Sequence, residues 1–86
     1  MAFYIAKQAE DELDKMPGDL KFRFTKHFQK IWEAPYGRHL RHGLPFFVEE
    51  VTKQARLIYR LDGDDVYVTR CFSLHKDYER WYRSYK

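Results

Sequence analysis

The sequence predicts a single α+β domain in which helices pack on one face of an antiparallel β-sheet. Two observations lead to this class. Within residues 55–72, two runs of alternating apolar and polar residues flank an Asp-Gly step, which is the pattern of a β-hairpin. Before and after the hairpin, apolar residues recur every three or four positions, which is the period of an amphipathic helix. The length of 86 residues suits one domain, 1–86, with a single core.

The chain begins with a predicted strand and two helices. Segment 2–6 is short, aromatic and β-branched, which favours a strand. From Lys7 the apolar residues fall at helical spacing, and Pro17-Gly18 ends this first helix. A second helix follows with Asp19 as its N-cap and ends at Pro35. The apolar positions of the two helices are Ala9, Leu13 and Met16, then Leu20, Phe24, Phe28, Ile31 and Trp32.

Three strands and a last helix complete the chain. A loop is predicted over 36–44, and Gly63 accepts the positive φ of the hairpin turn. The predicted strands are 46–52, 55–61 and 66–72. Short links join them, so neighbouring strands run antiparallel. The tail forms an amphipathic helix capped by Ser73, and its aromatic positions are Tyr78, Trp81, Tyr82 and Tyr85. The predicted order is β-α-α-β-β-β-α.

The two faces of the first hairpin strand differ in chemistry. Successive side chains of a strand point to opposite faces, so Leu57, Tyr59 and Leu61 share one face. This face is predicted to support the helices. The other face carries Arg56 and Arg60, with Ile58 between them. We expect it to be the working surface.

Composition and charge favour a cytosolic protein with a polyanionic partner. The net charge is +3 and the pI is about 9.0, with acid concentrated in 10–14 and base in 36–42 and 70–86. No apolar run approaches the roughly 20 residues that cross a bilayer. The N-terminus does not read as a secretory signal. A single cysteine, Cys71, allows neither an intrachain disulfide nor a cysteine metal cage.

Several kinds of catalytic site are disfavoured. His39 and His42 have the spacing of a zinc pair, but they are flanked by arginines without a nearby third ligand, so exposed loop histidines are the favoured interpretation. No metal or cofactor is predicted. Cys71 is interpreted as a small core residue. Glu49 and Glu50 point to opposite faces of a strand and cannot form a dyad, and a solvated charge is favoured over a single general base.

A cluster of basic and aromatic residues remains around the hairpin and tail. Its members are Arg56, Arg60, Arg70, His75, Lys76, Tyr78 and Arg80. Attack of an RNA 2′-hydroxyl on phosphorus needs a base, an acid and cations for the phosphorane charge. Histidine transfers protons near neutral pH, and arginine holds phosphoryl groups with two parallel hydrogen bonds. Burial on the sheet is the favoured interpretation of the tail aromatics, while surface and functional roles for the cations stay open.

The layout resembles the RelE/ParE superfamily of toxin–antitoxin toxins over nearly the whole chain. YIAKQAEDELDKMP is similar to the strand-and-helix opening of these toxins, and LRHGLPFFVEEVTKQARLIYRL to their centre. The spacing from Phe47 to Arg56 is similar to that of YoeB-type members. His75 lies near the place where several members carry a terminal histidine.

The resemblance implies a cytoplasmic toxin that is neutralised by a cognate antitoxin. RelE-like and YoeB-like members cut mRNA on the ribosome without a metal and so inhibit translation, whereas ParE-like members poison DNA gyrase. By position, Arg56 matches the arginine at the scissile phosphate, and His75 or Tyr78 the residue that transfers a proton. Glu49-Glu50 departs from the lysine or arginine that many nuclease members carry there.

The hypothesis from sequence is therefore an endoribonuclease toxin, an mRNA interferase. In it Arg56, His75 and Tyr78 are catalytic, and the cations that bind RNA phosphate are Arg60, Arg70, Lys76 and Arg80. The alternatives are a non-catalytic gyrase inhibitor and a detoxified module that still binds an antitoxin.

Overall fold

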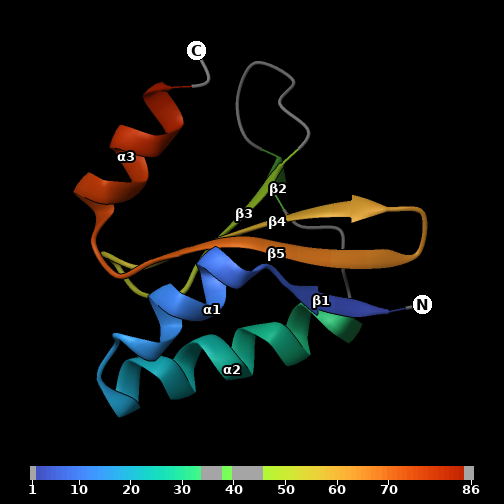
Figure 1. The fold of residues 1–86 in the computed structure, drawn as a ribbon, viewed down its shortest axis with the longest axis horizontal. Helices are drawn as coiled ribbons and strands as arrows, with labels where there is room; N and C mark the ends of the chain where they lie inside the picture. The colour runs from blue at the N-terminus through green and yellow to red at the C-terminus, as the bar shows by residue number, and fades with distance from the viewer. Residues whose placement is uncertain (1, 34–37, 40–45, 85–86) are drawn as a thin grey trace.

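The computed structural model describes residues 2–33, 38–39 and 46–84, and Figure 1 shows their arrangement. The elements are β1 (Phe3–Ile5), α1 (Lys7–Asp14), α2 (Gly18–Glu33), β2 (Arg38–His39), β3 (Phe47–Glu50), β4 (Arg56–Asp62), β5 (Asp65–Phe72) and α3 (His75–Arg83). They confirm the α+β class and the predicted order of the main elements. The short strand β2 falls within the segment predicted as a loop, whose other residues, His42 included, lie outside the described part of the chain.

The sheet has the strand order β1-β5-β4-β3-β2. Strands β3, β4 and β5 form the antiparallel meander that the short links predict. Strand β1 instead lies parallel to β5, with Phe3 opposite Val66, so the sheet is mixed rather than wholly antiparallel. A parallel pair needs a long connection. The helices and the meander that separate β1 from β5 along the chain supply it.

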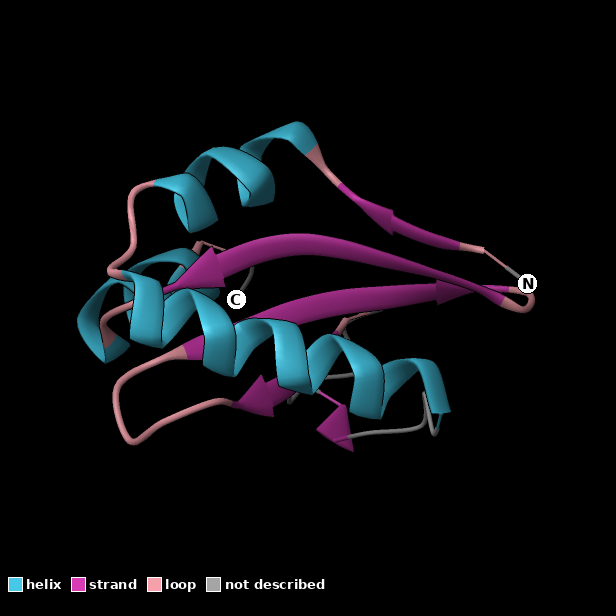
Figure 2. Cartoon of the chain, turned by 90° about the horizontal axis from the view of Figure 1, so that it is seen from below, coloured by secondary structure: helices cyan, strands magenta, loops and turns pink. Residues whose placement is uncertain are grey.

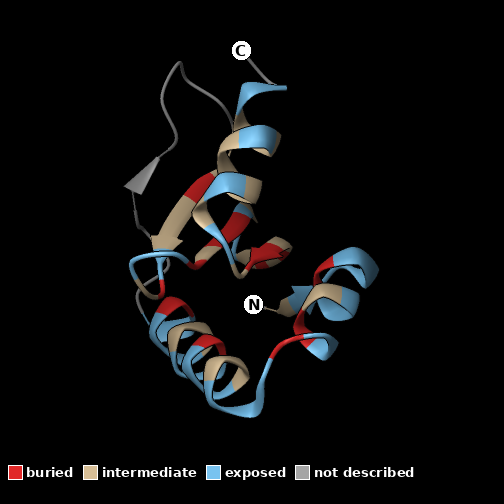
Figure 3. Cartoon of the chain, turned by 90° about the vertical axis from the view of Figure 1, so that its left-hand side faces the viewer, coloured by how far each residue is buried: buried red, intermediate tan, exposed pale blue. Residues whose placement is uncertain are grey.

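The helices lie on both sides of the sheet. Figures 1 and 2 show α1 and α2 together along one face, as the pattern of Leu57 and Tyr59 predicts. Helix α3 lies on the opposite side of the sheet from α1 and α2, as Figure 3 shows, so it departs from the expectation that all helices share one face. The cause is Phe72 at the end of β5. Its ring lies 6.3 Å from that of Tyr78 and 5.8 Å from that of Trp81, so α3 packs on it there.

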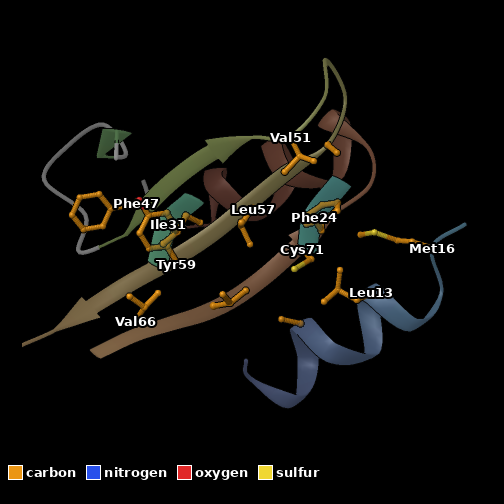
Figure 4. Packing of buried hydrophobic residues seen from close by; sticks show 13 residues of the cluster. Leu13, Met16, Phe24, Ile31, Phe47, Val51, Leu57, Tyr59, Val66 and Cys71 are labelled. Atoms are coloured by element: carbon orange, nitrogen blue, oxygen red, sulfur yellow. The ribbon is translucent and has the colours of Figure 1, made fainter. Parts of the chain in front are cut away.

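The main core lies between the sheet and the pair α1–α2 (Figure 4). Its fully buried members include Ala9, Phe24, Leu57, Tyr59, Val66 and Val68, each with 0% exposure. Leu61 is partly buried against this cluster. We call this side of the sheet the helix face. The other side, which carries Arg56, Ile58 and Arg60, we call the outer face; Ile58 is fully buried there, with 0% exposure.

A β-bulge interrupts the alternation of β5. Ile58 pairs with Arg70, but the next residue, Tyr59, pairs with Val68, so Thr69 is an extra residue. The Thr69 hydroxyl donates a hydrogen bond to the carbonyl oxygen of Ile58 at 3.2 Å. The insertion shifts the alternation by one, which brings Val68 and Cys71 to the same face.

The hairpin turn lies where the sequence predicts it, and helix α2 begins earlier than predicted. Gly63 adopts φ +59° in the tight hairpin turn, the conformation for which glycine was expected there. Helix α2 begins at Gly18, one residue before the predicted cap, so Asp19 lies in its first turn. A carboxylate in that turn still favours the positive end of the helix dipole.

Candidate functional site

Arg56 begins β4 and lies at the tight connection from β3. Its Nη1 atom donates hydrogen bonds to the carbonyl oxygens of Thr52, Lys53 and Ala55 at 2.9, 3.0 and 3.0 Å. These bonds anchor one nitrogen of the guanidinium on the backbone. A guanidinium carries five N–H groups, and among the described residues no hydrogen bond is made by Nε or Nη2, so this edge can face an anion.

Helix α3 places Tyr78 and His75 beside this arginine. The Arg56 guanidinium lies 5.9 Å from the centre of the Tyr78 ring. The Tyr78 ring in turn lies 5.6 Å from the His75 ring. Burial is intermediate for all three residues, so they are packed but accessible. The three residues predicted to be catalytic are thus brought together.

Two contacts that the sequence reasoning missed orient His75. Its Nδ1 lies 2.8 Å from a carboxylate oxygen of Glu79, one helical turn further on. Because the Glu79 carboxylate lies at Nδ1, we assign Nε2 as the nitrogen that faces a substrate. The i, i+4 spacing could have revealed this pair. The His75 backbone N–H donates to the Gln54 side-chain oxygen at 3.3 Å, a contact between distant segments that no local pattern predicts.

The other predicted cations lie elsewhere on the molecule. Arg60 stacks 4.6 Å over the Tyr67 ring, about 13 Å along the strand from Arg56. Burial raises the pKa of Tyr67, and the neighbouring Tyr4 and Asp65 raise it further. Lys76 is exposed in the first turn of α3. None of these side chains shares a contact with Arg56 among those resolved in the described residues.

Arg70 is engaged by a carboxylate. Its Nε lies 3.2 Å from both oxygens of Glu12, and its Nη2 lies 2.8 Å from one of them. A groove of about 460 Å³ opens beside this pair, between α1, the end of β5 and α3. Arg80 and Trp81 line its α3 side. The Arg80 guanidinium reaches Asp77 at 3.9 Å and remains largely exposed.

The strand register decides the orientation of the two adjacent glutamates. Glu49 pairs with Leu57 and faces α2, where its carboxylate accepts hydrogen bonds from Lys30 at 2.6 Å and from the His27 ring at 3.1 Å. Glu50 pairs with Arg56 and lies exposed on the outer face. Only one carboxylate of the pair therefore stands on the side of the candidate site.

Cys71 is enclosed in the core, as the sequence interpretation expects. It is 2% exposed, and desolvation raises the pKa of its thiol far above the ordinary value of 9.0, with Glu12 adding to the effect and Arg70 opposing it. A raised pKa keeps the nucleophilic thiolate rare near neutral pH.

We expect the Cys71 thiol to react with a disulfide reagent at least about 100-fold more slowly in the folded protein than in urea, because reaction requires opening of the core. The folded-state pKa is the higher one. Ionisation of Cys71 therefore does not affect the free energy of unfolding below pH 9.0. Above pH 9.0 this free energy falls as the pH rises toward the pKa of the folded protein. Labelling rates at pH 7, with and without urea, test this. A fast reaction in the native state would contradict it.

The described residues were also compared with what a metal site and a membrane-spanning helix require. Within these ranges, no three His, Cys, Asp or Glu side chains gather as a metal ion would require. No helix in this part of the chain is long and apolar enough to cross a bilayer. The His39 backbone lies in β2, opposite Phe47.

No protein-family model and no curated protein matches the sequence. Solved structures do. The isolated RelE toxin of E. coli aligns with a TM-score of 0.74 at 15% identity, over 98% of this chain and 97% of that one. A YoeB/ParE toxin from Agrobacterium tumefaciens aligns with a TM-score of 0.74 at 13% identity, over 84% of this chain and 96% of that one.

An antitoxin–toxin complex of RelB and RelE from Methanococcus jannaschii aligns with a TM-score of 0.73 at 12% identity, over 91% of this chain and 96% of that one. At sequence identities this low, the alignments show that the backbones share a fold and show nothing further. They bear out, at the level of the fold, the resemblance to these toxins that the sequence shows over nearly the whole chain. This chain has the fold of the RelE and YoeB toxins.

Proposed function

We propose that this protein is the toxin of a type II toxin–antitoxin module and a metal-independent endoribonuclease that cuts ribosome-bound mRNA. The observation that carries the proposal is the arrangement of Arg56, whose anchored guanidinium lies beside Tyr78 and His75. The fold shared with RelE and YoeB toxins supports the toxin role. A cytoplasmic location follows from this role.

The arrangement matches what RNA cleavage needs. A 2′-hydroxyl loses its proton and attacks phosphorus, the bond to the 5′-oxygen breaks, and that oxygen takes up a proton. Arg56 would hold the phosphoryl oxygens through its Nε–Nη2 edge as negative charge builds up. His75, beside Glu79, would accept the proton of the 2′-hydroxyl at Nε2, and a water molecule would supply the proton that the leaving 5′-oxygen takes up.

The start of α3 adds to the attraction for a phosphate. The prediction of Ser73 as the cap is wrong, because Leu74 is the N-cap residue and makes no side-chain hydrogen bond; the Gln54 side-chain oxygen accepts a hydrogen bond of 3.3 Å from the first N–H of the helix. Helix N-termini favour anions because the backbone N–H groups there lack acceptors. Arg56 contacts the ring of Tyr78 in this helix, so we expect a phosphate bound by Arg56 to lie near the helix end.

A cognate antitoxin is the proposed protein partner. Several solved structures with this fold are complexes, including RelBE of E. coli and YoeB–YefM of Staphylococcus aureus. Co-expression with the neighbouring reading frame, followed by purification through a tag on one chain, tests for it.

Glu50 favours a second candidate function. Its carboxylate lies opposite Arg56 on the outer face and would repel phosphate. This repulsion suits a toxin that inhibits DNA gyrase without cutting RNA, or a module that retains only antitoxin binding.

Incubation of the purified protein with mRNA-programmed ribosomes, followed by primer extension, tests the proposed function. We expect cleavage of the ribosome-bound message. If the mRNA stays intact and DNA supercoiling by gyrase is inhibited, the protein is a gyrase inhibitor and not a ribonuclease. Intact mRNA with unaffected supercoiling and growth would leave the antitoxin-binding module.

Replacement of Tyr78 separates its ring from its hydroxyl. We expect Tyr78→Phe to cleave within about threefold of the parent, because its phenyl ring can keep the contacts with Phe72 and Arg56 while His75 moves the proton. Tyr78→Ala should lower the cleavage rate by about 5- to 150-fold, which corresponds to the ~1–3 kcal/mol that stacking of an RNA base on the ring would contribute. Single-turnover rates measure both. An equal loss in the two variants would assign the proton transfer to the hydroxyl.

A further inference from the structure

Glu12 joins α1 to the end of β5 through four hydrogen bonds. It accepts three from Arg70 and a fourth, at 2.9 Å, from the backbone N–H of Cys71. Strand β1 pairs with β5 only as far as Val68, so Cys71 lies beyond the reach of that neighbouring strand. The carboxylate supplies the acceptor that strand pairing would otherwise provide.

This pair leaves Arg70 poorly suited to hold a phosphate. Two of its three guanidinium nitrogens already bond to Glu12 in a bidentate, charge-assisted arrangement. The side chains of Arg70 and Glu12 are only 22% and 23% exposed, so a competing anion would have to break a partly desolvated ion pair.

Arg70 contacts the residue on which α3 rests. Its guanidinium lies 4.6 Å over the Phe72 ring. Phe72 is 5% exposed and contacts the rings of Tyr78 and Trp81. A continuous chain of contacts therefore runs from α1 to the aromatic side of α3.

We infer that Glu12 and Arg70 are positioning residues: their ion pair fixes Phe72, and Phe72 fixes α3 so that Tyr78 and His75 stand beside Arg56. The part of this inference that concerns catalysis rests on the proposed function. The part that concerns the placement of α3 does not. Glu12 acts without touching RNA, and the sequence role of Arg70 as a phosphate ligand is replaced by a structural one.

Fluorescence of Trp81 tests the placement of α3 directly. Trp32→Phe leaves Trp81 as the only tryptophan, because the chain has two. In this background we compare the parent with Glu12→Gln, which keeps the size of the side chain but removes its charge. We expect Glu12→Gln to shift Trp81 emission to longer wavelength and to increase its quenching by iodide. Glu10→Gln, an exposed residue of the same helix, is the matched control and should change neither.

A charge exchange distinguishes positioning from contact with RNA. Ribosome-dependent cleavage is measured for Glu12→Gln and for the double variant Glu12→Arg/Arg70→Glu, with kcat and KM separated. A small displacement of catalytic groups can cost about 100-fold, so we expect Glu12→Gln to lower kcat by about 10- to 100-fold with little change in KM. The double variant restores opposite charges at the two positions but supplies neither the acceptor for the Cys71 N–H nor the guanidinium over Phe72, so it should recover only part of the Trp81 spectrum and of kcat.

Three results would overturn the inference or divide it from the proposed function. An unchanged Trp81 spectrum in Glu12→Gln would show that the pair does not hold α3. A KM that is higher in the double variant than in Glu12→Gln would mean that Arg70 binds RNA. If the parent cuts no RNA while the Trp81 signal responds as expected, the proposed function fails and the placement of α3 by Glu12 and Arg70 stands.

Discussion

Replacement of Arg56 with alanine is expected to lower ribosome-dependent mRNA cleavage by about 10²- to 10³-fold, the usual cost of removing one donor that stabilises transition-state charge. The guanidinium is held by three backbone carbonyls, so little ordering is left for it to undergo when phosphate binds. The loss should appear mainly in kcat. Single-turnover cleavage of a message in the ribosomal A site measures it.

Two variants serve as controls for Arg56. Arg60→Ala removes the same charge from the same strand face but from a side chain stacked on Tyr67, so it should stay within about threefold of the parent. Arg56→Lys keeps the charge and loses the planar fork, so we expect an intermediate loss. Equal losses for Arg56→Ala and Arg60→Ala would mean that net charge, not the anchored guanidinium, supports the activity.

Replacement of Phe24 with alanine is expected to destabilise the protein by about 3–5 kcal/mol. Phe24 is 0% exposed and fixes α2 on the helix face of the sheet. A domain of this kind has a free energy of unfolding of roughly 5–15 kcal/mol, so this single change removes a large part of it. Urea unfolding followed by circular dichroism measures the loss through the midpoint at constant slope.

Phe22 offers a control on the same helix. It lies two residues before Phe24 and is 59% exposed, with Lys26 stacked 5.1 Å from its ring. We expect Phe22→Ala to change the free energy of unfolding by less than about 0.5 kcal/mol. Similar losses at both positions would contradict the observed orientation of α2.

The candidate site could be predicted in part. Alternation places Arg56 on the outer face, the resemblance assigns it to the scissile phosphate, and His75 and Tyr78 follow in a basic, aromatic tail; their catalytic roles stay predictions. The structure adds the contacts that orient them, from Gln54 and Glu79. Gln54 and His75 are 21 positions apart and meet only because the β3–β4 link and the start of α3 lie at one end of the sheet.

Arg70 illustrates why charge alone could not assign roles. By sequence it is one more cation near the hairpin, equivalent to Arg60 or Arg80. Its pairing with Glu12 spans 58 positions and depends on how α1 packs beside β5. The same holds for Glu49 and Glu50, whose alternation was predictable but whose absolute orientation needed the pairing of β3 with β4.

The sequence by itself determined the local elements: the hairpin around Gly63, the amphipathic helices, and the separation of Leu57 and Tyr59 from Arg56 and Arg60. These depend on neighbours within a few positions, whose periodicity and turn chemistry are visible in the chain. Only the tertiary structure decided the parallel pairing of β1 with β5 and the placement of α3 on the outer face. It also decided the capture of Arg70 by Glu12. Such contacts join distant segments, and packing selects them after the local elements have formed.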